Sequence, residues 1–198
     1  MLTSEEIYKL FSDEEYGVSI HLNKAEVSNG DLQLYFGINR DFAFSNPESD
    51  ENWRIEDKAY KDSRLGFGSM AAFIIAEDDP LLWKYTDVQC ELYFSGKCTE
   101  PANLITDLYS LELELFKNYQ HFGEYLNGGD IFQFLNAGSG LFARGPQKLL
   151  SKYADNLAKY NINTSIITTS PFKDDQLKIL LLSDHGYVIA EKFNFVRQ

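Results

Sequence analysis

The longest periodic apolar pattern in the chain runs from Leu104 to Leu126, and it constrains the fold more than any other stretch. Apolar residues recur there at steps of three and four, which is close to the period of an α-helix of about 3.6 residues and longer than that of a coiled-coil seam. The residues on this spacing are Leu104, Leu108, Leu111, Leu115, Tyr119, Phe122 and Leu126. The pattern predicts a long central helix over about residues 103–126.

A second apolar line runs beside the first and widens the apolar face of this helix. Its members are Ile105, Tyr109, Leu113 and Phe116. With both lines buried, we expect the helix to be covered over much of its circumference. Replacing Leu111 or Leu115 with Ala should then cost roughly 2–5 kcal/mol.

The residues after the central helix predict a turn and further helices. Two glycines, Gly128 and Gly129, suit the left-handed conformation that ends a helix. Residues 131–135 have helical offsets, with a strand as the alternative. Pro146 suits the first turn of a second helix over about residues 146–160, because the N–H that proline lacks is unpaired there in any case. The apolar face of that helix is made of Leu149, Leu150, Tyr153, Leu157 and Tyr160.

Several other stretches alternate in hydrophobicity with the period of a β-strand. Asn29-Gly30 predicts a tight hairpin, and a change of parity near Asn23 predicts a bulge in its first strand. Residues 69–76 fit either a strand or a short helix. Ile179 to Leu182 predicts an interior strand, with residues 187–196 as the second arm of a hairpin. Together the patterns predict a single α+β domain over residues 1–198, with a largely antiparallel sheet packed on one side by the two helices.

The composition predicts a folded, soluble protein. The chain is 44% hydrophobic, 15% aromatic and 24% charged, which argues against disorder. No apolar run reaches the roughly 18–20 residues of a membrane span, and the first twenty residues are acidic where a secretory signal is basic and then apolar. We therefore expect a cytoplasmic location.

The formal net charge of −12 and the pI near 4.6 limit the classes of partner. An acidic surface repels phosphate backbones and anionic lipids, so we expect neither nucleic-acid nor membrane binding. A basic protein is compatible with this charge. Solubility alone explains the charge equally well, and the oligomeric state is left open.

The pattern of reactive residues predicts neither an enzyme nor a metal or cofactor site. Cys90 and Cys98 lack the spacing of a ligand pair, and the three histidines are far apart with no HxxxH or HxH pattern. No nucleophile motif is present. Neighbouring carboxylates such as Asp78 and Asp79 are expected to be solvated rather than to act as an acid–base pair.

One glycine-rich stretch could bind a small anion. Gly138, Ser139 and Gly140 precede Arg144 and Lys148, where the second helix is expected to start. Glycine lets backbone N–H groups approach an anion, the amino end of a helix favours negative charge, and the two side chains add cations. In the other interpretation these glycines only turn the chain. The spacing matches no dinucleotide or phosphate-loop motif.

Tyrosines on the outward side of their strands, together with acidic loops, predict a binding surface for a basic protein. The residues assigned to it are Tyr35, Tyr60, Tyr93, Glu48, Asp50, Glu51, Asp78 and Asp79. The expected function is thus a non-catalytic interaction module, similar to an inhibitor or immunity protein that masks a basic partner. The alternatives are a small-anion or nucleotide-binding protein and, third, a hydrolase-type enzyme.

Overall fold

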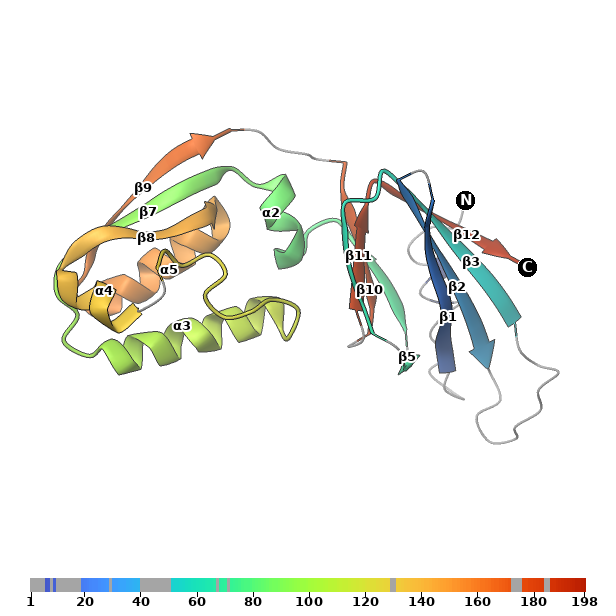
Figure 1. Cartoon of the computed structure of the whole chain (residues 1–198), viewed down its shortest axis with the longest axis horizontal. Helices are drawn as coiled ribbons and strands as arrows, with labels where there is room; N and C mark the ends of the chain where they lie inside the picture. The colour runs from blue at the N-terminus through green and yellow to red at the C-terminus, as the bar shows by residue number, and fades with distance from the viewer. Residues whose placement is uncertain are drawn as a thin grey trace. The chain divides into compact units, whose positions relative to one another are not determined.

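The computed structural model describes residues 6, 7, 9, 19–28, 30–39, 51–66, 68–70, 72–128, 131–171, 176–183 and 186–198. It has an α+β fold with mostly antiparallel sheets, as predicted (Figure 1). The backbone forms two compact units: unit 1 comprises Met1–Asp79 and Gln176–Gln198, and unit 2 comprises Pro80–Asp175. That the whole chain behaves as one domain stays a prediction.

Unit 1 consists of two antiparallel sheets that share one apolar core. The first has the order β12-β3-β2-β1-β5, and the second has the order β4-β11-β10-β6. The strands of the first sheet are β1 (Ser19–Ser28), β2 (Asp31–Asn39), β3 (Glu51–Lys58), β5 (Ser69–Met70) and β12 (Lys192–Arg197). Those of the second are β4 (Asp62–Leu65), β6 (Phe73–Ala76), β10 (Lys178–Leu182) and β11 (Gly186–Ala190). Phe36 of β2 meets Phe73 of β6 edge to face, with ring centroids 4.8 Å apart, so the two sheets pack through their inner faces.

The hairpin predicted at Asn29-Gly30 joins β1 to β2. Gly30 has a φ of 84°, a value that glycine adopts without steric cost. The register shifts between Leu22 and Lys24, which confirms the predicted bulge near Asn23. Along β2 every second side chain is buried, as the alternating pattern predicts: Leu32, Leu34, Phe36 and Ile38.

Two other expectations for unit 1 are resolved by the strand pairing. Residues 69–76, which fit either a strand or a helix, contain β5 and β6. Residues 187–196 were expected to form one arm of a hairpin with Ile179–Leu182, and this is only half correct. β11 pairs with β10, but the chain then changes sheet at Glu191, and β12 pairs with β3.

Unit 2 has three layers: a sheet, helix α5 and helix α3 (Figure 1). The sheet has the order β8-β7-β9, formed by β8 (Ser139–Pro146), β7 (Gln89–Ser95) and β9 (Asn163–Ser170). α5 (Gln147–Lys159) packs on one face of all three strands, and α3 (Pro101–Phe116) packs against α5. The shorter helices are η2 (Pro80–Leu82), α2 (Trp83–Thr86) and α4 (Ile131–Ala137). The predicted helices over about 146–160 and 131–135 are therefore confirmed as α5 and α4.

The central helix is shorter than predicted. It begins with Pro101 in the first turn, where proline costs no hydrogen bond, and ends at Phe116 instead of continuing to about residue 126. Lys117 has a φ of 53°, a left-handed conformation that breaks the helix. Residues 117–128 then run through turns. The helical spacing of Tyr119, Phe122 and Leu126 therefore does not reflect a helix.

The segment after α3 instead pairs with β8. The backbone N–H of Asn127 donates to Phe142 O at 2.8 Å, and that of Arg144 donates to Tyr125 O at 2.9 Å. These bonds, and the bridge between Leu126 and Ala143, cover one edge of the three-stranded sheet. A long-range pairing of this kind leaves no periodic signal in the sequence.

No helix in the described part of the chain is long and apolar enough to cross a membrane.

Candidate functional site

α3 has one buried face and one exposed apolar face. Leu104 and Leu108 are fully buried, and Phe116 is 1% exposed. Bordering the buried face, Tyr109 is 51% exposed and Leu113 is 44% exposed. Phe122, in the turns after the helix, is 38% exposed and meets Tyr109 edge to face at a centroid distance of 5.5 Å. We call Tyr109, Leu113 and Phe122 the α3 patch.

This arrangement corrects the expectation that the second apolar line is buried. Of its four members only Phe116 lies inside; Ile105 is half-buried, and Tyr109 and Leu113 face water. The reason is the order of the layers. α3 is the outermost layer of unit 2, so it has α5 on one side and, among the described residues of unit 2, no sheet on the other.

A buried carboxylate holds the inner face of α3 against α5. Glu112 Oε1 accepts a 2.5 Å hydrogen bond from the hydroxyl of Tyr153, and Oε2 accepts one of 3.1 Å from the N–H of Gly123. Burial raises the pKa of Glu112, while the bonds from Tyr153 and Gly123 oppose that rise. The contact orients α3 and also fixes the turn that carries Phe122.

The charges on α3 have one sign. The helix carries Asp107, Glu112 and Glu114 and no basic residue. Asp107 accepts a 3.0 Å hydrogen bond from the hydroxyl of Tyr160, whereas Glu114 is exposed. The α3 patch is thus apolar with acidic neighbours on the helix, and Lys117 and His121 lie beyond the helix end.

The structure separates the residues predicted to bind an anion. Gly138 precedes β8, Ser139 and Gly140 begin that strand, and Lys148 follows its far end. A strand of this length spans roughly 25 Å. Arg144, near that far end, is paired with Glu91 of β7 at 2.8 Å. Gly138 therefore lies in the bend between α4 and β8, whereas Gly140 belongs to a sheet strand, where a turn between helices was expected.

The first turn of α5 is already bound by a carboxylate of the chain. Asp87 Oδ2 accepts a 2.7 Å hydrogen bond from the N–H of Lys148. The Lys148 ammonium lies 5.5 Å from the centroid of the Trp83 ring. Asp87 therefore occupies the position that an external anion would take at this helix end.

The three predicted tyrosines are divided between the two units. Each is half-buried, and each hydroxyl is hydrogen-bonded on its own strand or turn: Tyr35 to Gln33, Tyr60 with Ser63, and Tyr93 to Glu91. The bond to Glu91 raises the pKa of Tyr93 and lowers that of Glu91. Tyr35 and Tyr60 belong to unit 1, whereas Tyr93 belongs to unit 2.

The structure describes only some of the acidic residues that were predicted to bind a partner. Glu48 and Asp50 lie outside the described residues. Glu51 accepts a 3.1 Å hydrogen bond from the Trp53 indole and lies 3.4 Å from Arg197. Asp78 is exposed and Asp79 is half-buried, in the turn after β6.

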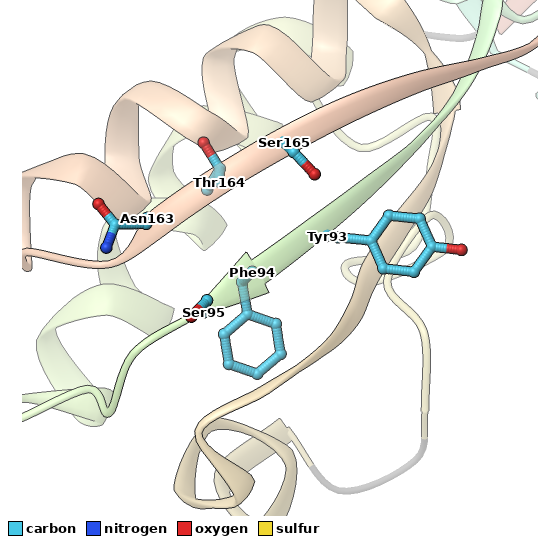
Figure 2. Close-up of a pocket in the computed structure, with 6 residues that line it drawn as sticks. All are labelled: Tyr93, Phe94, Ser95, Asn163, Thr164 and Ser165. Carbon is cyan, nitrogen blue, oxygen red and sulfur yellow. The ribbon is translucent and has the colours of Figure 1, made fainter.

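A small pocket of about 180 Å³ lies over β7 and β9. Figure 2 shows the residues that line it: Tyr93, Phe94, Ser95, Asn163, Thr164 and Ser165. Pockets for small molecules usually enclose about 300–1,000 Å³ and combine apolar walls with a few convergent polar groups. This pocket is smaller, and none of its lining side chains is charged.

Asp57 is a buried acid in the core of unit 1. It follows Trp53 and Ile55 on the inner side of β3 and is 1% exposed. Neither carboxylate oxygen has a hydrogen-bond partner among the described residues. Burial, with a smaller contribution from Asp31, raises the pKa of Asp57 to about 8. No group of three or more His, Cys, Asp or Glu residues in the described ranges could hold a metal ion.

Comparison of the chain with protein-family models, curated proteins and solved structures finds no match.

Proposed function

We propose that the protein is a non-catalytic module that binds another protein, and that the α3 patch is its docking surface. The observation that carries this proposal is the exposure of Tyr109 and Leu113 on a helix whose inner face is buried. Clustered apolar side chains at the surface of a folded unit are typical of interaction sites.

The patch has the properties of an energetic centre of an interface. Tyrosine is enriched at such centres because it buries a large area and loses little side-chain freedom. Tyr109 is already held by its contact with Phe122, and the turn carrying Phe122 is held by the bond from Gly123 to Glu112. A partner would therefore meet a surface that is largely ordered before binding.

The charge of the chain favours a basic partner. The net charge is −12, and α3 itself bears only acids. Attraction between opposite charges accelerates the encounter of two proteins and is weakened by salt, whereas the apolar contacts determine how long the complex lasts. This is the chemistry of a protein that masks a basic surface. The free thiols Cys90 and Cys98 are consistent with the cytoplasmic location expected from the sequence.

Affinity capture with a matched control tests the proposal. The baits are wild type, Tyr109→Ser/Leu113→Ser and Val27→Ser, the last changing an equally apolar side chain that is 64% exposed in unit 1. We expect one basic protein to be recovered by wild type and Val27→Ser, and to be lost with the double variant or at high salt. With that protein purified, the double variant should bind at least about tenfold more weakly.

The proposal fails if the double variant, shown to be folded by its urea unfolding curve, recovers the same proteins as wild type. Recovery that is equally reduced by Val27→Ser would also contradict it, because the loss would then not be specific to α3. The small-anion alternative has no comparable support, since Arg144 and the first turn of α5 both have acidic partners within the chain.

A further inference from the structure

Most strands at the edges of the described sheets are short, charged or covered. β12 and β4 carry charged residues, β5 has two residues, and β6 has four. The part of β1 beyond its pairing with β5 contains a bulge, Lys24 and Glu26. One side of β8 is covered by residues 125–127. Features of this kind prevent a sheet from adding further strands.

Within the described part of the chain, β9 has none of these protections. It has eight residues, pairs with β7 on one side and is the last strand of its sheet (Figure 1). Its sequence, NTSIITTS, contains no charge and no proline, and its β-branched residues favour an extended strand. The pairing with β7 is regular from Asn163 to Thr168, with an irregularity only near the end. Ile167 is 53% exposed.

The composition of β9 fits a second copy of itself. In an antiparallel pair of two β9 strands, only Asn, Ser, Thr and Ile can lie opposite one another, so no like charges meet. In a chain with a net charge of −12, two copies would meet less local repulsion at this uncharged edge than at a charged one. Pairing between two copies would add backbone hydrogen bonds beside Ile166 and Ile167 and would remove the Ile167 side chain from water.

We propose that two copies of the chain associate through their β9 edges, antiparallel and about a twofold axis beside Ile167. The two three-stranded sheets then form one six-stranded sheet, with the α5 helices of both copies on the same face. Such an interface is isologous, because each copy contributes the same strand. Because each copy contributes one strand of eight residues, we expect an interface below the typical size of about 1,600 Å² and therefore a weak, concentration-dependent dimer.

Sedimentation velocity over a concentration series, up to millimolar chain, tests this dimer. The full-length chain should convert from monomer to dimer as concentration rises. Ile167→Lys places two ammonium groups near the axis and should abolish the dimer at all concentrations. The matched control, Val27→Lys, replaces an exposed apolar residue of β1 and should dimerise like wild type. Urea unfolding confirms that both variants are folded.

A second variant locates the contact directly. Ile167→Cys should form a cross-linked dimer under mild oxidation, because the axis brings the two thiols together, whereas Val27→Cys should not. A wild-type chain that stays monomeric throughout would overturn the proposal. An Ile167→Lys variant that dimerises like wild type would also overturn it. So would hydrogen-exchange measurements in which the backbone amides of β9 become protected only when an extended segment of a different protein is bound.

Discussion

The hydroxyl of Tyr153 on α5 donates a 2.5 Å hydrogen bond to Oε1 of Glu112 on α3, and both side chains are buried. Tyr153 is fully buried and also contacts Phe142 of β8, with ring centroids 6.1 Å apart. This residue therefore joins the sheet, α5 and α3. The polar bond sets which face of α3 turns inward, and so which face is left to form the α3 patch.

Removing the hydroxyl should destabilise the fold. Tyr153→Phe leaves Oε1 of Glu112 buried without this donor, which costs roughly 1–3 kcal/mol. Urea unfolding of Tyr153→Phe, Glu112→Leu and the double variant measures the coupling. We expect a coupling free energy between the two changes of about 1 kcal/mol or more. Strictly additive effects would show that the hydrogen bond does not contribute.

Because the pKa of the buried Asp57 carboxyl is raised, we expect the free energy of unfolding to fall as the pH rises. The folded protein keeps the proton on Asp57 up to a pKa of about 8, whereas the unfolded chain releases it near the ordinary value of 3.8. Between these values the folded state binds more protons, so the free energy of unfolding decreases with pH, by up to about 1.4 kcal/mol per pH unit. Above pH 8 this contribution levels off.

Asp57→Asn tests that dependence, because the amide does not titrate. The variant should gain stability over wild type as the pH rises from about 4 towards 8, the window bounded by the two pKa values. Asp155→Asn, at an exposed position of α5, is the control for the same change from acid to amide. Parallel profiles for wild type and Asp57→Asn in urea unfolding would contradict the prediction.

Two leucines of α3 should differ sharply in their contribution to stability. Leu108 is fully buried, so Leu108→Ala should cost roughly 2–5 kcal/mol. Leu113 is 44% exposed. Leu113→Ala should therefore change the free energy of unfolding by no more than about 0.5 kcal/mol. Leu111 and Leu115, which the sequence pattern singles out, are only half-buried, and intermediate values are expected. Equal costs at Leu108 and Leu113 would show that both faces of α3 are covered.

Asp87 should stabilise the start of α5 and exclude external anions. Asp87→Ala removes the acceptor for the Lys148 N–H. This change should cost about 1 kcal/mol, as is usual for the loss of a helix cap. In wild type, millimolar phosphate should leave the melting temperature unchanged. A rise in melting temperature that Arg144→Ala abolishes would instead support the anion-binding alternative.

Local patterns predicted much of the secondary structure. The alternation in β2, the Asn29-Gly30 hairpin and the apolar face of α5 each depend on neighbours within a few residues, so local sequence is enough to predict them. The end of α3 is not determined by such local neighbours. Tyr119 and Leu126 continue the helical spacing, but pairing of residues 125–127 with β8 competes with the helix, and only the folded chain shows which wins.

The candidate sites were less predictable. The glycines at 138 and 140 have the same local signature in a turn as in a strand, and the place of Gly140 in β8 depends on β7, which lies far earlier in the chain. Tyr109 and Leu113 are apolar, so the sequence favours burial for both. The sequence did hold one indication that part of α3 is exposed. Its two apolar lines make a face wider than a single packing layer can cover.

The sequence by itself determined the α+β class, most of the strands and α5, because these follow from periodicity and turn chemistry within short segments. The tertiary structure alone decided where α3 ends, which of its apolar lines faces water, and which sheet edge is left unprotected. These features depend on the order of layers and on pairing between distant segments. Secondary-structure propensity carries no information about the order of layers or about pairing between distant segments, because the same local sequence is compatible with more than one arrangement.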